Sequence, residues 1–130
     1  MSVEVTVREA VIAALKGDAA LMEGLNGLFD GQPTRASIPY AVVGECIASE
    51  WGAKDVTGRE LRLSISLHDA GETPGRLAGL LGRIDPAIES ADASGAGWRI
   101  VSARLARSRL AKLGEGWLAV VDYRLRVVAE

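Results

Sequence analysis

One stretch of the sequence, Leu61-Arg62-Leu63-Ser64-Ile65-Ser66-Leu67-His68, alternates apolar and polar side chains without a break. Successive side chains of a β-strand point to opposite faces, so one face of this strand is aliphatic and the other is polar. Such a strand belongs to a sheet that packs one face against a core and leaves the other face open. The stretch therefore predicts a sheet that is covered on one side.

Three more strands are expected around this one. Tyr40–Trp51, which is apolar at first and alternates weakly later, precedes it, with a turn expected at Gly52–Arg59. Trp98–Leu110 and Trp117–Val128 follow later in the chain. The last two runs are separated by a short segment with two glycines, which favours a tight turn. The chain is therefore expected to form two hairpins.

Helical spacing precedes the first hairpin. Thr6 and Glu9 have the spacing of a capping box, and Gly17 is placed to end this first helix in a left-handed turn. Asp18 can then cap a short second helix, Ala19–Leu25.

A third helix is expected between the hairpins. It begins near Thr73-Pro74, because proline is well tolerated at the first helical position. Its apolar stripe consists of Leu77, Leu80, Leu81 and Ile84.

The order of these elements defines the expected fold class. Leu28–Pro39 is expected to be a linker and Ser90–Gly97 a loop, because glycine, proline and small polar residues interrupt both. The rest predicts an α+β fold, with an antiparallel or mixed sheet of about four strands and helices packed on one face. A chain of 130 residues fits a single domain, residues 1–130.

The composition is that of an ordinary globular domain, with 48% hydrophobic and 25% charged residues. The single cysteine, Cys46, excludes an internal disulfide and is expected to be a small buried hydrophobe. No apolar run approaches the roughly 20 residues of a membrane span, and the first residues lack a signal-peptide pattern. We therefore expect a chain that folds in a cytoplasm and has no membrane partner.

Charge is distributed unevenly along the chain. Residues 1–98 contain eight Lys or Arg and fourteen Asp or Glu, and residues 99–130 contain seven and three, so the two parts carry −6 and +4. Identical subunits that meet head to tail can use such a polarised surface, although a solvated sheet face with uneven charge is the alternative. The candidate subunit-interface residues are six of the seven basic residues in the last part of the chain: Arg104, Arg107, Arg109, Lys112, Arg124 and Arg126.

Few residues could support catalysis or bind a cofactor. The only histidine, His68, is next to Asp69, but neighbouring strand residues point to opposite faces and do not form an acid–base pair. One histidine and one cysteine do not provide a metal site, and the glycines form neither a phosphate loop nor a nucleophile elbow. We expect no enzyme activity, cofactor or metal. A deep pocket lined by His68 and Asp69 would instead favour an enzyme or a ligand-binding protein.

The same basic run leaves a nucleic-acid-binding role open. The spacing Arg104-x-x-Arg107-x-Arg109-x-x-Lys112 could follow a row of phosphates. Aromatic residues make up only 5% of the chain, so few rings are present to stack on bases. Contact with DNA is therefore expected to be independent of its sequence.

Four segments together resemble a family of small phage and prophage proteins. They are Gly17-Asp18-Ala19-Ala20-Leu21, Ile38-Pro39-Tyr40-Ala41-Val42-Val43-Gly44-Glu45, Leu67-His68-Asp69 and Tyr123-Arg124-Leu125-Arg126-Val127-Val128. In this order they extend over nearly the whole chain and resemble the tail terminator, or tail completion, proteins of siphophages and phage-like gene transfer agents.

This resemblance implies a structural protein of the neck or tail end of a virion or gene transfer agent particle, made in the cytoplasm of a host bacterium. A homo-hexameric ring would cap the tail tube, end tube polymerisation and join the tail to the head. The implied partners are further copies of the chain, the tail tube protein, a head–tail connector or stopper protein, and DNA that passes through the lumen. The alternatives are another neck component, such as a head-completion protein, and a non-specific nucleic-acid-binding module.

Overall fold

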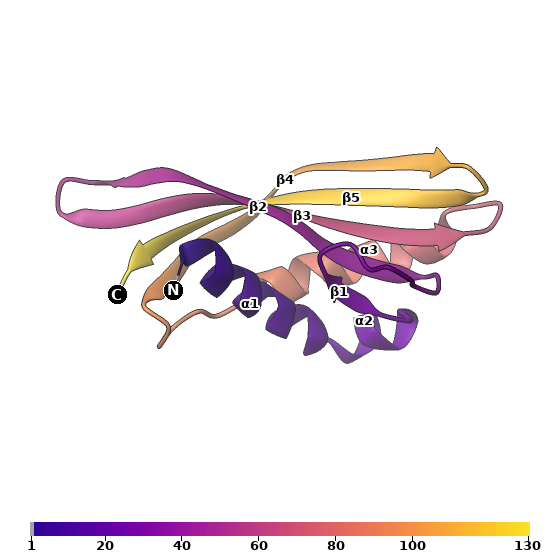
Figure 1. Cartoon of the computed structure of the whole chain (residues 1–130), viewed down its shortest axis with the longest axis horizontal. Helices are drawn as coiled ribbons and strands as arrows, with labels where there is room; N and C mark the ends of the chain where they lie inside the picture. The colour runs from indigo at the N-terminus through magenta and orange to yellow at the C-terminus, as the bar shows by residue number, and fades with distance from the viewer. Residues whose placement is uncertain (1) are drawn as a thin grey trace.

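The chain folds into one long, twisted sheet with helices beneath it, as the computed structural model of residues 2–130 shows (Figure 1). The α+β prediction, with helices on one face of a sheet, is confirmed. The elements are α1 (Val3–Lys16), α2 (Ala19–Gly24), β1 (Leu28–Asp30), β2 (Tyr40–Ala53), β3 (Val56–Ala70), α3 (Gly75–Glu89), β4 (Trp98–Leu113) and β5 (Gly116–Ala129). No helix within residues 2–130 is long and apolar enough to cross a lipid bilayer.

The sheet has five strands in the order β1-β2-β3-β5-β4, so the expectation of about four strands is wrong by one. The sheet is mixed, because β1 runs parallel to β2 while all other neighbours are antiparallel. The additional strand, β1, lies in the segment Leu28–Pro39 that was expected to be a linker. Three residues between glycines show no periodicity, and this strand exists only because Phe29 pairs with Val42 of β2.

The first hairpin is longer than expected. β2 and β3 pair as far as Ala53 and Val56, so most of the expected turn Gly52–Arg59 is strand. Its glycines mark close approach of the two strands rather than a loop. A Cβ at Gly58 would lie 2.3 Å from the carbonyl oxygen of Trp51 on the paired strand.

The helix ends agree only in part with the expected caps. Ser2, not Thr6, caps α1, with its hydroxyl accepting a hydrogen bond from the Val5 amide at 3.3 Å. Thr6 is buried inside the helix, and Gly17 has a φ of −76°, so the capping box and the left-handed turn are both wrong. Asp18 does cap α2, as expected, through the Leu21 amide at 2.9 Å.

The core is a single apolar layer between the sheet and the helices. The alternating residues of β3 and β5 supply the sheet side, and the apolar stripes of α1 and α3 supply the other side. The largest fully buried side chains are Leu15, Leu21, Leu61, Leu63, Ile65, Leu67, Leu77, Ile84, Ile88, Leu125, Val7 and Val11. Cys46 is only half-buried, and it packs against this layer from β2.

Candidate subunit interface

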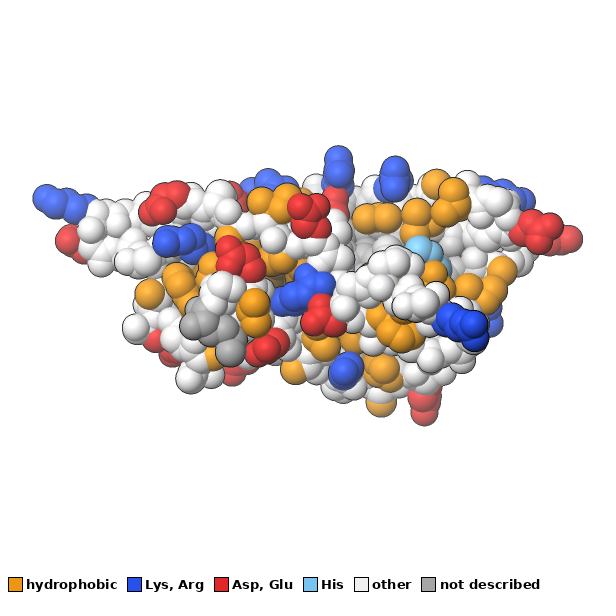
Figure 2. All heavy atoms as spheres, in the orientation of Figure 1, with side chains coloured by type: hydrophobic (Ala, Val, Ile, Leu, Met, Phe, Trp, Pro, Cys, Tyr) orange, Lys and Arg blue, Asp and Glu red, His pale blue; other side chains and the backbone are white. Residues whose placement is uncertain are grey.

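The face of the sheet opposite the helices is polar and open. Six side chains on it form what we call the arginine face: Arg62, Arg104, Arg107, Arg109, Arg124 and Arg126. Arg62 of β3 and Arg104 of β4 both lie directly opposite Arg124 of β5, so three arginines form one row across the sheet. Figure 2 shows Lys and Arg side chains along the upper margin of the molecule, on the sheet side.

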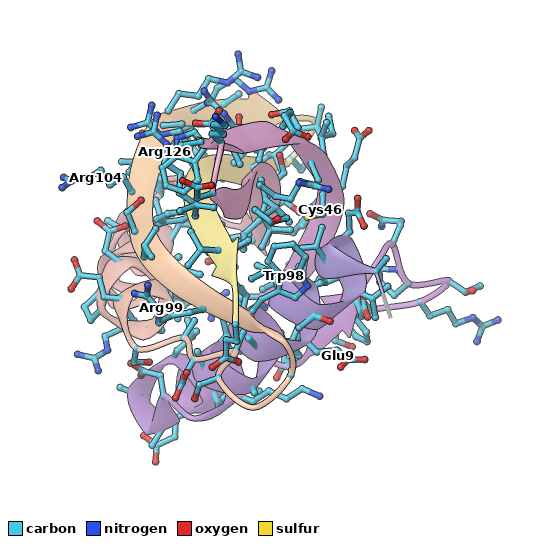
Figure 3. The ribbon with its side chains drawn as sticks, turned by 90° about the vertical axis from the view of Figure 1, so that its left-hand side faces the viewer. Glu9, Cys46, Trp98, Arg99, Arg104 and Arg126 are labelled. Atoms are coloured by element: carbon cyan, nitrogen blue, oxygen red, sulfur yellow. The ribbon has the colours of Figure 1, made fainter. Side chains whose placement is uncertain are left out.

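A β-bulge brings the arginines of β4 to one face. Arg104 and Arg107 are three positions apart, and regular alternation places residues at an odd spacing on opposite faces. The register shifts between Leu105 and Arg107, and as a result Arg104 lies opposite Arg124 and Arg107 opposite Asp122. In Figure 3 Arg104 points outward from the border of the sheet, whereas Trp98 at the start of β4 points inward.

Asp122 neutralises one of these arginines. It accepts a hydrogen bond from Nε of Arg107 at 2.8 Å and another from the hydroxyl of Ser64 on β3. The hydrogen bond from Ser64, followed by that from Arg107, lowers the pKa of the Asp122 carboxyl. The carboxylate is therefore ionised at neutral pH and holds Arg107 in position between β4 and β5.

Glu60 and Trp51 restrain the arginines of β5. One oxygen of Glu60 lies 3.4 Å from Nε of Arg124 and 3.4 Å from Nε of Arg126. The guanidinium of Arg126 also lies over the ring of Trp51, 5.3 Å from its centroid. Nε of Arg126 is buried and makes no hydrogen bond within residues 2–130, so the contact with Glu60 is an ion pair without hydrogen-bond geometry.

The remaining arginines of the face have no such restraint. Arg62, Arg104 and Arg109 form no ion pair within residues 2–130. A row of like charges across a sheet is unfavourable in isolation. Such a row becomes favourable when anionic groups of another molecule approach it, and the arginine face is therefore a candidate contact surface.

Five of the six predicted interface residues belong to this face. Lys112 is the exception, because it lies opposite Trp117 on the helix side of the sheet, with Nζ 5.7 Å from the ring centroid. The acidic partners Glu60 and Asp122 were not predicted. Asp122 alternates with Arg124 and Arg126 on β5, which places it on the same face. Glu60 belongs to β3, and the pairing of β3 with β5 was needed to bring it opposite Arg126.

His68 and Asp69 point to opposite sides of β3, as strand alternation predicts. The His68 ring stacks on Tyr40 at 4.5 Å between centroids, and burial lowers the pKa of the imidazole. Asp69 lies on the helix side and binds Arg76, whose hydrogen bonds lower the pKa of the carboxyl. The two residues therefore do not act on a common substrate atom. Within residues 2–130 no cluster of His, Cys, Asp or Glu side chains is arranged to hold a metal ion.

Comparison with protein families gives one match. A family model described as "Tail completion protein gp17" matches residues 9–130 of the chain. A search of curated proteins found no match.

Comparison with solved structures gives the same fold over nearly the whole chain. A chain of the structure "Virion of native gene transfer agent (GTA) particle" is 17% identical, with a TM-score of 0.79 and 95% of each chain covered. The "Structure of bacteriophage SPP1 gp17 protein" is 16% identical, with a TM-score of 0.65, and covers 94% of this chain and 88% of that one. At this level of identity the likeness concerns the fold alone.

Proposed function

Since the chain belongs to the tail completion protein gp17 family, we propose that it is a structural subunit at the tail end of a phage or gene transfer agent particle. In this role it forms a homo-hexameric ring that caps the tail tube, ends its polymerisation and joins the tail to the head. It carries out no reaction of its own, and its contribution is the set of contacts it makes with its neighbours.

The observation that carries this proposal is the open face of the sheet. The helices pack on one side only, and the other side presents six arginines on a broad surface. A broad, charged sheet face suits contact with other subunits better than recognition of a small molecule, which is usually bound in a concave and mostly apolar pocket.

The ends of the sheet offer separate contacts for other particle proteins. The β2–β3 hairpin projects past the helices at one end of the molecule, and the β4–β5 hairpin reaches the other end (Figure 1). In a ring whose axis follows the strands, one set of hairpins meets the tail tube protein and the other set meets the connector or stopper protein. DNA passes through the lumen without being read.

Deletion of the gene from the producing bacterium tests this proposal. Electron microscopy is expected to show tails of uncontrolled length that are not joined to heads, and expression of the wild-type chain is expected to restore uniform particles. Tails of normal length and attachment in the deletion strain would overturn the proposal. Tails that end normally on heads that lose DNA would instead identify a head-completion component.

The row formed by Arg62, Arg104 and Arg124 favours one second candidate, a non-specific nucleic-acid-binding module. Such a module would bind duplex DNA with an affinity that falls steeply with salt and falls further when these arginines are replaced by alanine. Fluorescence anisotropy at several salt concentrations measures both effects. Tight binding at physiological salt, together with normal tails in the deletion strain, would favour this candidate over the ring subunit.

A further inference from the structure

Two borders of the sheet are left without a partner strand within residues 2–130. β4 forms one border along its whole length, Trp98–Leu113. β2 forms part of the other, because β1 covers only Ala41–Val43 and leaves the segment 45–53 open. Unpaired strand borders present rows of amide and carbonyl groups that can bind another strand.

The covered and open parts of β2 meet at Arg8. Its guanidinium donates hydrogen bonds to the carbonyl oxygens of Val43 and Gly44 and to the carboxylate of Asp30 on β1. β1 and Arg8 together therefore satisfy the first part of this border. The open border begins at the next residue, Glu45.

The two open borders carry opposite charges. The charged residues of β2 are Glu45 and Glu50, both exposed, and the strand has no Lys or Arg. The charged residues of β4 are all basic: Arg99, Arg104, Arg107, Arg109 and Lys112.

These charges are available for contact with another molecule. Glu45 forms no ion pair within residues 2–130, and the Glu50 side chain is 86% exposed, at 3.5 Å from Arg59. On β4, Arg104 and Arg109 are equally without an ion pair in that part of the chain. Exposed apolar side chains accompany the charges on both borders, with Ile47 at 55% exposure and Leu110 at 48%.

We propose that the β4 border of one copy pairs with the open β2 border of the next, so that the sheets of neighbouring subunits become continuous. The proposal rests on the proposed function as a ring subunit and names the contact that closes the ring. Pairing β4 with β4 would place cations opposite cations, and pairing β2 with β2 would place carboxylates opposite carboxylates. Only the head-to-tail pairing brings opposite charges together, and a heterologous contact of this kind is the one that generates a ring.

Strand direction is consistent with this contact. β2, β3, β5 and β4 are antiparallel in succession, so β2 and β4 of one copy run in opposite directions. Rotation about an axis along the strands preserves their directions. β4 therefore meets β2 of the neighbouring copy antiparallel, and the two can form a regular ladder of hydrogen bonds.

Protection of the borders is the competing explanation. Charged residues and bulges on border strands commonly prevent aggregation, and β4 has both. Protection alone predicts that reversing these charges does not promote pairing with any strand. Head-to-tail pairing predicts that two oppositely altered copies bind each other.

Two variants test the proposal. The acidic-border variant carries Arg104→Glu, Arg109→Glu and Lys112→Glu, and the basic-border variant carries Glu45→Lys and Glu50→Lys. In each variant alone, like charges face each other at every contact. The protein concentration needed for assembly is therefore expected to be at least about 10-fold higher than for the wild type. An equimolar mixture is expected to assemble like the wild type, since alternating copies place opposite charges at every contact.

Native mass spectrometry measures the assembly, and circular dichroism verifies that each variant is folded. The controls are Lys16→Glu/Arg35→Glu and Glu23→Lys/Glu72→Lys, which reverse exposed charges outside the two borders and should assemble like the wild type. The proposal is overturned if the single variants assemble normally, if the mixture fails to recover, or if the wild type stays monomeric at the highest concentration reached. The deletion phenotype is measured independently of this contact. If the deletion strain makes defective tails and both border variants restore normal ones, the border contact is ruled out while the proposed function is still supported.

Discussion

Asp122 of β5 accepts a hydrogen bond from Arg107 of β4 at 2.8 Å, and this contact depends on the bulge that precedes Arg107. The carboxylate is mostly covered, with 15% of the side chain exposed, whereas the Arg107 side chain is 83% exposed. The same carboxylate also binds Ser64, so it connects three strands on the open face of the sheet. The relationship is therefore asymmetric. The covered Asp122 carboxylate needs its hydrogen-bond partners to replace water, whereas the exposed Arg107 side chain remains in contact with solvent.

That asymmetry leads to a prediction for stability. Arg107→Ala is expected to lower the free energy of unfolding by less than about 1 kcal/mol, since an exposed cation contributes little. Asp122→Ala is expected to cost about 1–2 kcal/mol, because it also removes the acceptor of Ser64. Urea unfolding measures both values, with Arg109→Ala as the control that should lie near the wild type. Equal losses for Arg107→Ala and Asp122→Ala would contradict this account.

Asp69 predicts how stability depends on pH. Its carboxyl lies at the end of β3 with 4% of the side chain exposed, and hydrogen bonds from Arg76 lower its pKa in the folded chain. A lowered folded pKa stabilises the protein above the unfolded value of about 3.9, and this stabilisation is lost as pH falls through the folded pKa.

Asp69→Asn is therefore expected to lower the free energy of unfolding by about 1–2 kcal/mol at pH 7, a value kept small because the Arg76 side chain is 59% exposed. The gap between wild type and variant should close as the pH is lowered towards 2. Thermal unfolding across this pH range measures the gap, with Asp55→Asn in the β2–β3 turn as the control. If the difference in unfolding free energy between wild type and variant stays constant with pH, the charge of Asp69 does not contribute to stability.

The sequence predicted the fold where side-chain pattern and strand pairing agree. The alternation of Leu61–His68 identified β3 and the side of the sheet that faces the core, and the family resemblance is confirmed by the match over residues 9–130. β1 was missed, because three residues have no period of their own and depend on Val42 for pairing.

The candidate interface was predictable only in part. A basic run in a strand shows which charged residues are close in sequence. The face of the sheet on which each side chain lies is set by how the strand pairs with its neighbour. The bulge before Arg107 moves Arg107 and Arg109 to the face of Arg104, whereas Lys112 falls on the other side. A bulge is set by the fit between two strands, so neither strand predicts it alone.

Cys46 provides a test of local opening. Burial raises the pKa of its thiol to about 11, so the folded chain holds little thiolate at pH 8. Alkylation by iodoacetamide at this pH is expected to be roughly 10- to 100-fold slower in the folded chain than in urea, after allowing for the greater nucleophilicity of a more basic thiolate. Mass spectrometry at timed intervals measures both rates, and Cys46→Ser is the unreactive control. Similar rates in both conditions would indicate that β2 opens readily.

Two glycines are expected to respond to alanine in opposite ways. Gly58→Ala would place Cβ 2.3 Å from the Trp51 carbonyl oxygen, so the β2–β3 hairpin has to shift. The expected cost is about 1–3 kcal/mol of unfolding free energy. Gly79→Ala lies inside α3, where a Cβ meets no atom within 4 Å, and is expected to stabilise the protein by about 0.5–1 kcal/mol.

Thermal and urea unfolding of both variants measure these changes. Trp51 also supports Arg126 at 5.3 Å, so Gly58→Ala should in addition alter the tryptophan fluorescence and, through the arginine face, weaken self-association. Gly79→Ala should change neither property, because α3 lies on the other side of the sheet. A Gly58→Ala chain as stable as the wild type would mean that the hairpin is looser than its close strand approach indicates.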